Sequence, residues 1–161
     1  MKKIIALTLS LLFCLSLIGC GGNYVDNVTS SEITDILEKS VPTDGGYVEA
    51  ESDFITFNLK DTESLFLDCK IILAVESGSN ANEIGVFRAK DKKAAKKISE
   101  TCNDYLVKKA EHWNYDYNPS ENVKIENSDV KVFGTYVVYT VLTPSDSELA
   151  FVAVENLLAT K

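Results

Sequence analysis

Residues 130–142 read VKVFGTYVVYTVL, and this stretch decides the fold because two runs of strand-forming residues meet at a two-residue turn. Gly134 and Thr135 form the turn, and glycine in the first central position is typical of tight β-hairpin turns. The second run, residues 136–142, is rich in β-branched and aromatic residues, which are enriched in strands. The stretch therefore predicts two antiparallel strands that are joined directly.

A second hairpin is indicated earlier in the chain. Every second residue of the stretch 69–75 is strongly apolar and the residues between them are mixed, which predicts a strand with one apolar face and a partly covered second face. Residues 77–82 are rich in serine, asparagine and glycine, and residues 84–89 are again apolar. This order predicts a turn followed by a second strand.

A helix is predicted after each hairpin. Asp91 is a favourable N-cap for a helix that continues to about Glu111. Apolar residues recur at helical spacing along its inner face, namely Ala95, Ile98, Cys102, Tyr105 and Leu106. After the second hairpin, Pro144 precedes Ser145 and Glu148, which have the spacing of a capping box and predict a final helix.

The region before the first hairpin contains one clear element. Thr29 and Glu32 form a capping box that predicts a helix over residues 30–40, and Pro42 ends it. Residues 47–67 fit neither the helical nor the strand period, so no element is predicted there.

The order of these elements predicts an α+β fold. After the N-terminal helix the pattern is β-β-α-β-β-α, and the hairpins supply antiparallel strand pairs. Since amphipathic helices need a surface to cover, we expect an antiparallel sheet of about four strands with the helices packed on one face.

The first 22 residues have the pattern of an export signal. Lys2 and Lys3 precede an apolar stretch over residues 4–18, which has 15 residues, whereas a helix that crosses a membrane needs about 20. Residues 17–20, LIGC, resemble the lipobox of bacterial lipoproteins. That resemblance implies cleavage before Cys20 and a diacylglyceryl group on its thiol. The acyl chains of such a group are typically palmitate.

The sequence therefore predicts three parts, with a lipoprotein signal peptide over residues 1–19, a lipidated, flexible tether over residues 20–29 and a single α+β domain over residues 30–161. The expected location is the extracytoplasmic face of the cell membrane, with the lipid on Cys20 as the anchor. A cell-wall polymer or a protein is the expected partner in addition to the membrane.

The charge of the chain limits its partners. The formal net charge is −8, from 16 basic and 24 acidic residues. Removal of Lys2 and Lys3 with the signal leaves 14 basic residues, hence 14 − 24 = −10. Such a charge disfavours nucleic acid and anionic lipid as partners, because both require basic patches. The lysines at 90, 92, 93, 96 and 97 are the local exception, and they either face an anionic surface or form a solvated helix face.

Few residues point to a chemical site. Trp113, Tyr115 and Tyr117 are a candidate aromatic ligand platform, although aromatic residues after a helix more often anchor a loop on the core. His112 is the single histidine. No catalytic residue, metal ligand or cofactor is predicted. Once Cys14 leaves with the signal and Cys20 carries lipid, only Cys69 and Cys102 remain, and we expect two buried, inert thiols rather than a disulfide.

One family resemblance can be named from these residues. The run EIGVFRAKD at residues 83–91, the lysine-rich helix after it and the strand over residues 134–139 are similar to the small Gram-positive lipoprotein family called domain of unknown function 4358. The resemblance covers roughly residue 30 to the end, and it implies no activity.

We therefore expect a membrane-tethered extracytoplasmic lipoprotein that acts as a non-catalytic binding or accessory module. One alternative is a cell-surface hydrolase that uses carboxylates, which predicts a deep pocket where two acidic side chains converge. Another is a structural or assembly protein of the cell envelope, which predicts an exposed apolar patch.

Overall fold

A computed structural model describes residues 23–116 and 118–160. The predicted signal peptide and Cys20 lie outside the described residues, as does Tyr117. The described elements, in chain order, are α2 (Ser30–Ser40), β1 (Tyr47–Glu49), α3 (Phe54–Asn58), β2 (Phe66–Ala74), β3 (Glu83–Ala89), α4 (Lys92–His112), the 3-10 turn η1 (Pro119–Glu121), α5 (Asn122–Glu126), β4 (Asp129–Phe133), β5 (Tyr136–Val141) and α6 (Pro144–Leu158).

The strands form one antiparallel sheet in the order β1-β2-β3-β5-β4. Both predicted hairpins are confirmed. In the second hairpin Phe133 pairs with Tyr136, and Gly134 has a φ of 65°, a left-handed conformation that a glycine adopts without strain. The α+β class and the antiparallel sheet are therefore as the pattern predicts.

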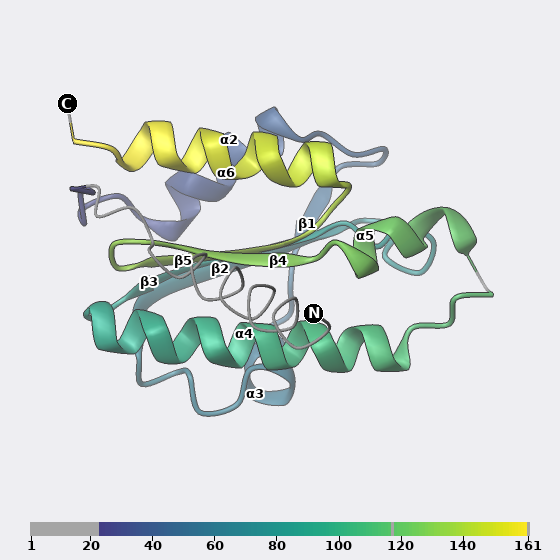
Figure 1. Cartoon of the computed structure of the whole chain (residues 1–161), viewed down its shortest axis with the longest axis horizontal. Coiled ribbons are helices and arrows are strands. Elements are labelled where there is room, and N and C mark those ends of the chain that lie inside the picture. Colours follow the sequence, from purple (N-terminus) through teal and green to yellow (C-terminus); the bar gives the residue numbers. More distant parts are fainter. Residues whose placement is uncertain (1–22, 117, 161) are drawn as a thin grey trace, which may run out of the picture.

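Helices cover both faces of this sheet, so the expectation of helices on one face is wrong. Figure 1 shows α4 on one side of the sheet and α2 with α6 on the other. The physical reason is that β3 and β5 are apolar on both faces. Phe87 and Tyr139 belong to the core under α4, and Val86 and Val138 belong to the core under α2 and α6.

The predicted helix ends are partly right. The capping box of α2 is present, with the Thr29 side chain accepting from the Glu32 N–H, and Asp91 caps α4 in the same way. The predicted capping box of α6 is wrong. Thr143, rather than Ser145, is the N-cap and accepts from the Asp146 N–H, which leaves Pro144 in the first turn, where a missing N–H costs nothing.

The region 47–67, where no element was predicted, contains a short edge strand and a short helix. β1 has three residues and adds a fifth strand to the sheet beside β2, so the sheet has one strand more than expected. α3 has five residues, no side-chain cap and no buried residue. Elements this short span little more than one helical or strand period, so the period does not repeat and they cannot be recognised from it.

The segment just before α2 is packed against the domain. Tyr24 forms a β-bridge with Ala159, and the Val25 N–H donates to the Leu158 carbonyl at 2.8 Å. Val28 is bound twice by the Tyr136 hydroxyl, which accepts from its N–H and donates to its carbonyl. Residues 23–28, part of the expected flexible tether, are thus fixed to the domain.

Both remaining cysteines are free. Cys102 is fully buried under α4, and Cys69 lies partly exposed beside the same core. Both thiols therefore lie at one core without a bridge, as predicted, but the expectation that both are buried is right for Cys102 only. None of the described helices has the length and apolar content that a membrane span requires.

Candidate functional site

A buried carboxylate stands at the start of β3. Glu83 has a relative exposure of only 1%, and three groups bind it. The Tyr139 hydroxyl donates to Oε1 at 2.7 Å, the Tyr105 hydroxyl lies 2.9 and 3.1 Å from the two oxygens, and Lys109 Nζ lies 2.7 Å from Oε2. Both carboxylate oxygens are thus hydrogen-bonded, as a buried charge requires.

A glycine makes this arrangement sterically feasible. Gly85 pairs with Tyr139 across β3 and β5, and the Tyr139 ring lies flat over it. A Cβ at position 85 would be 2.0 Å from Tyr139 Cε1, closer than any real contact. The spacing of Glu83 and Gly85 on one strand therefore lets the ring cross the strand and reach the carboxylate.

The two phenols remain hydrogen-bond donors at ordinary pH. Burial, followed by the charge of Glu83, raises the pKa of Tyr139 and of Tyr105 well above the usual value. Lys109 supplies the compensating charge from α4, and its side chain is 24% exposed. The cluster of Glu83, Tyr105, Tyr139 and Lys109 is consequently a buried charge pair with one end open to solvent.

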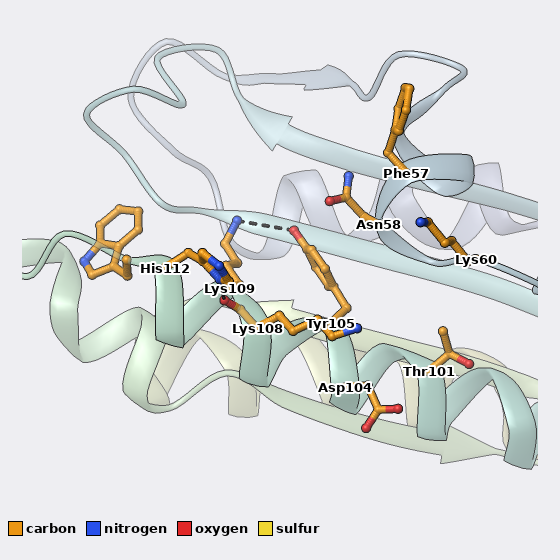
Figure 2. A pocket seen from close by; sticks show the side chains of 10 residues that line it. Phe57, Asn58, Lys60, Thr101, Asp104, Tyr105, Lys108, Lys109 and His112 are labelled. Carbon is orange, nitrogen blue, oxygen red and sulfur yellow. Dashed lines mark hydrogen bonds between the residues drawn. The ribbon is translucent and has the colours of Figure 1, made fainter.

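That open end lies in a groove between α3 and α4, with a volume of about 720 Å³ (Figure 2). Three lysines line it, Lys60, Lys108 and Lys109, together with His112 and a single carboxylate, that of Asp104. Two further polar residues, Asn58 and Thr101, line the groove. The groove is therefore a basic site on the surface of an acidic protein.

Aromatic rings complete the groove. Tyr105 lines it from α4, Phe57 from α3, and Trp113 where α4 ends. Phe57 is 69% exposed, more than any other large apolar side chain among the described residues. Lysine ammonium groups beside rings suit a ligand that carries an anionic group on an apolar body.

The predicted platform is only partly assembled. Trp113 is half-buried, lines the groove and donates from Nε1 to Asn122 Oδ1 at 3.0 Å. Tyr115 is 38% exposed and is not among the residues that line the groove. Tyr117 lies outside the described residues. Of the three candidate residues, the structure brings only Trp113 to the groove.

The groove offers no obvious metal-binding set. Among residues 23–116 and 118–160, no group of three or more histidine, cysteine, aspartate or glutamate side chains could hold a metal ion. The Nδ1 atom of His112 lies 2.7 Å from the Lys108 carbonyl oxygen, a contact within the last turn of α4.

Glu83 and the groove were not predicted from the sequence. Glu83 stands in an apolar strand, and its partners Tyr105 and Tyr139 are 22 and 56 residues away along the chain. One signal was available. A tyrosine in the inner stripe of the long helix needs a polar partner when buried, and an acidic residue at the start of a buried strand needs a donor.

The class of the domain is an α+β fold with a five-stranded antiparallel sheet and a basic groove on α4. The chain belongs to the family described as Domain of unknown function (DUF4358), whose model matches residues 53–142. The expected domain of unknown function is thus confirmed over a shorter stretch than residue 30 to the end, and the match spans the groove and the Glu83 cluster. No curated protein and no solved structure matches the chain.

Proposed function

We propose that the mature protein is a lipid-anchored, extracytoplasmic binding module whose groove between α3 and α4 takes a small anionic ligand with an apolar body. The anchor rests on the lipobox-like residues 17–20 and the apolar stretch before them. The binding role rests on one observation, which is the concentration of four basic side chains and three rings around a hollow of about 720 Å³.

Charge supports an anionic ligand. Three lysines and His112 line the groove together with the Asp104 carboxylate, and the charge of Lys109 is already balanced by Glu83. Two of them, Lys60 and Lys108, form no ion pair within the described residues, so their charge is available to a ligand. The electrostatic field of such a site draws anions and repels cations.

The carboxylate hydrolase is less well supported at this groove. A glycosidase-like mechanism requires two carboxylates that converge on one bond. Asp104 is the one carboxylate that lines the groove, and Glu83 is covered by its tyrosine and lysine partners. A binding role needs neither group to react.

Trp113 offers a direct measurement, because it is the single tryptophan of the chain and it lines the groove. We expect phenyl phosphate to change the Trp113 fluorescence in a saturable way. Benzylamine, which has a similar ring but a positive charge, should not bind measurably. Equal responses to both compounds would contradict an anionic ligand.

Variants locate the site. Lys108→Gln should weaken phenyl phosphate binding roughly tenfold, or about 1.4 kcal/mol, since one charge-assisted contact is lost. Lys39→Gln is the matched control, because Lys39 is an exposed helical lysine that does not line the groove, and its affinity should be unchanged. Equal losses in both variants would mean that the groove is not the binding site.

The anchor is tested separately. Cys20→Ser should abolish incorporation of a fatty acid analogue during metabolic labelling, because the thiol is the proposed lipid acceptor. Cys69→Ser is the control and should be labelled as the unaltered protein is. Label on the Cys20→Ser protein would refute the anchor while leaving the groove proposal standing.

A further inference from the structure

The docked segment 23–28 fixes where the proposed anchor joins the domain. The Tyr24 side chain lies against Gly134, with 3.3 Å between its Cβ and the position a Cβ would take on the glycine. The adjacent Thr135 carbonyl accepts from the Ala89 N–H at 2.9 Å. Two residues later Asp91 caps α4. The attachment point and the start of α4 therefore share one end of the molecule, which Figure 1 shows at the left.

Five exposed lysines gather at that same end. We call them the lysine end, and they are Lys90, Lys92, Lys93, Lys96 and Lys97. Helical side chains lean toward the N-terminus of their helix, so those on α4 lean toward the attachment point. Of these five lysines, only Lys96 forms an ion pair within the described residues, at 3.9 Å from the Glu100 carboxylate.

Apart from Lys96, the side chains of these lysines form no hydrogen bond or ion pair with the described residues. Positive charge in the first turn of a helix opposes the helix dipole, and the capping carboxylate of Asp91 is engaged by the Ala94 N–H at 2.7 Å. Asp26 also lies in the docked segment, so the positive surface belongs to α4 rather than to the whole end. A basic surface kept at some cost to its helix indicates an anionic partner.

We propose that the domain stands on the membrane by this end, with the lysine end against anionic lipid headgroups. The inference rests on the proposed anchor at Cys20. Only three residue steps separate Cys20 from Asn23, and a chain spans at most about 3.6 Å per residue, so the docked segment lies within about 11 Å of the lipidated residue. The lysine end lies at the same end of the molecule as the docked segment, and each lysine that reaches an anionic bilayer surface adds about fivefold to the affinity.

The same geometry places the groove away from the bilayer. α4 begins at the lysine end and rises about 1.5 Å per residue. Thr101, the first residue of α4 in the groove, is then about 14 Å from Lys92, and His112, near its far end, is about 30 Å from it. A groove at this height faces the cell envelope rather than the lipid.

Two positions on α4 test the orientation. Lys93 and Glu111 are exposed and 18 residues apart, which is five helical turns, so they share a side of α4 and differ by about 27 Å in height. Each is changed to Cys in the lipidated full-length protein and labelled with a fluorophore. The unaltered chain, treated in the same way, gives the background fluorescence from label on Cys69 and Cys102. The protein is placed in phosphatidylglycerol vesicles that carry a headgroup quencher.

Quenching at least threefold stronger at position 93 than at position 111 is expected. Equal quenching, or stronger quenching at position 111, would overturn the orientation. Mass spectrometry of the same sample records the lipid on Cys20, so a lipidated protein with equal quenching overturns this inference alone. A sample without lipid and without quenching at either position overturns both the anchor and the inference.

Charge reversal tests the lipid contact. Lys92→Glu with Lys96→Glu should reduce the quenching at position 93 at least twofold. Lys39→Glu with Lys108→Glu makes the same change in net charge away from the lysine end, and it should leave that quenching unchanged. Equal effects of the two pairs would overturn the contact between the lysine end and the headgroups.

Discussion

At the scale of single residues, Gly85 connects the sheet to the buried carboxylate. The Tyr139 ring occupies the space where any other residue at 85 would place its Cβ, and that ring holds Glu83. Glycine is therefore required at position 85 because of the Tyr139 ring on the neighbouring strand, and not because of the backbone conformation of Gly85 itself.

We predict that Gly85→Ala destabilises the protein by about 1–3 kcal/mol, because the ring is rigid and must shift away from Glu83. The free energy of urea-induced unfolding measures it. Gly78→Ala is the control, since a Cβ there meets nothing within 4 Å, and we expect a change below about 0.5 kcal/mol. Equal small effects would show that the Tyr139 ring can move without loss.

The ion pair of the cluster is asymmetric. Lys109 is 24% exposed and its ammonium can turn to water, whereas the Glu83 side chain is 2% exposed and cannot. We predict that Lys109→Met costs about 3–5 kcal/mol, because it strands a buried charge. Glu83→Gln should cost about 1–2 kcal/mol. Urea-induced unfolding of the two single variants measures the two costs, and the double variant completes the cycle that gives their coupling. A larger cost for Glu83→Gln would contradict the asymmetry.

The thiol of Cys69 should react slowly. Burial is the main cause that raises its pKa, to about 11. Since the thiolate is the reactive form, we expect iodoacetamide to modify it about 100-fold more slowly at pH 8 than it modifies the unfolded chain. The folded state holds this proton more tightly, so its contribution to stability is complete below about pH 8.5 and falls as the pH rises toward 11. A rate at pH 8 equal to that in urea would contradict the raised pKa.

At the scale of the elements, the start of α6 provides a matched pair of variants. Thr143 accepts from the Asp146 N–H and donates to the Asp146 carboxylate at 2.7 Å, whereas Ser145 makes no bond to a backbone N–H of the first turn. We predict that Thr143→Ala costs about 1 kcal/mol in thermal unfolding. Ser145→Ala should cost less than half of that. A larger cost for Ser145→Ala than for Thr143→Ala would show that Ser145 is the N-cap, as the sequence suggested.

Local patterns predicted the elements whose signals lie within a few residues. The capping box at Thr29, the cap at Asp91 and the turn at Gly134 are each complete within four positions, and each is present. The start of α6 misled because two candidate N-caps, Thr143 and Ser145, flank Pro144, and a proline fits the first turn of a helix better than the position before its cap. α3 has only five residues, so its pattern was too short to see.

At the scale of the whole molecule, the sheet has two cores rather than one. The mixed face of β2 was predicted to be partly covered. Ile72 and Ala74 on that face are buried, and Ile72 belongs to the core that β2 shares with α2. Burial on both faces could not be derived because it depends on which helix crosses to which side. For the same reason the groove was not predicted, since it forms where α3 meets α4 from distant parts of the chain.

The bridge between Tyr24 and Ala159, together with the bond from the Thr160 N–H to the Asn23 carbonyl at 3.0 Å, also makes the domain a candidate for circular permutation. A short glycine linker from Thr160 to Asn23 would close the ring, and the exposed turn between Ser77 and Gly78 is a suitable place to open it. We predict that such a chain regains the same far-ultraviolet circular dichroism and cooperative unfolding, with its new ends at the β2–β3 turn. Failure to fold would mean that the order of synthesis, rather than the closed contact of the old ends, determines this architecture.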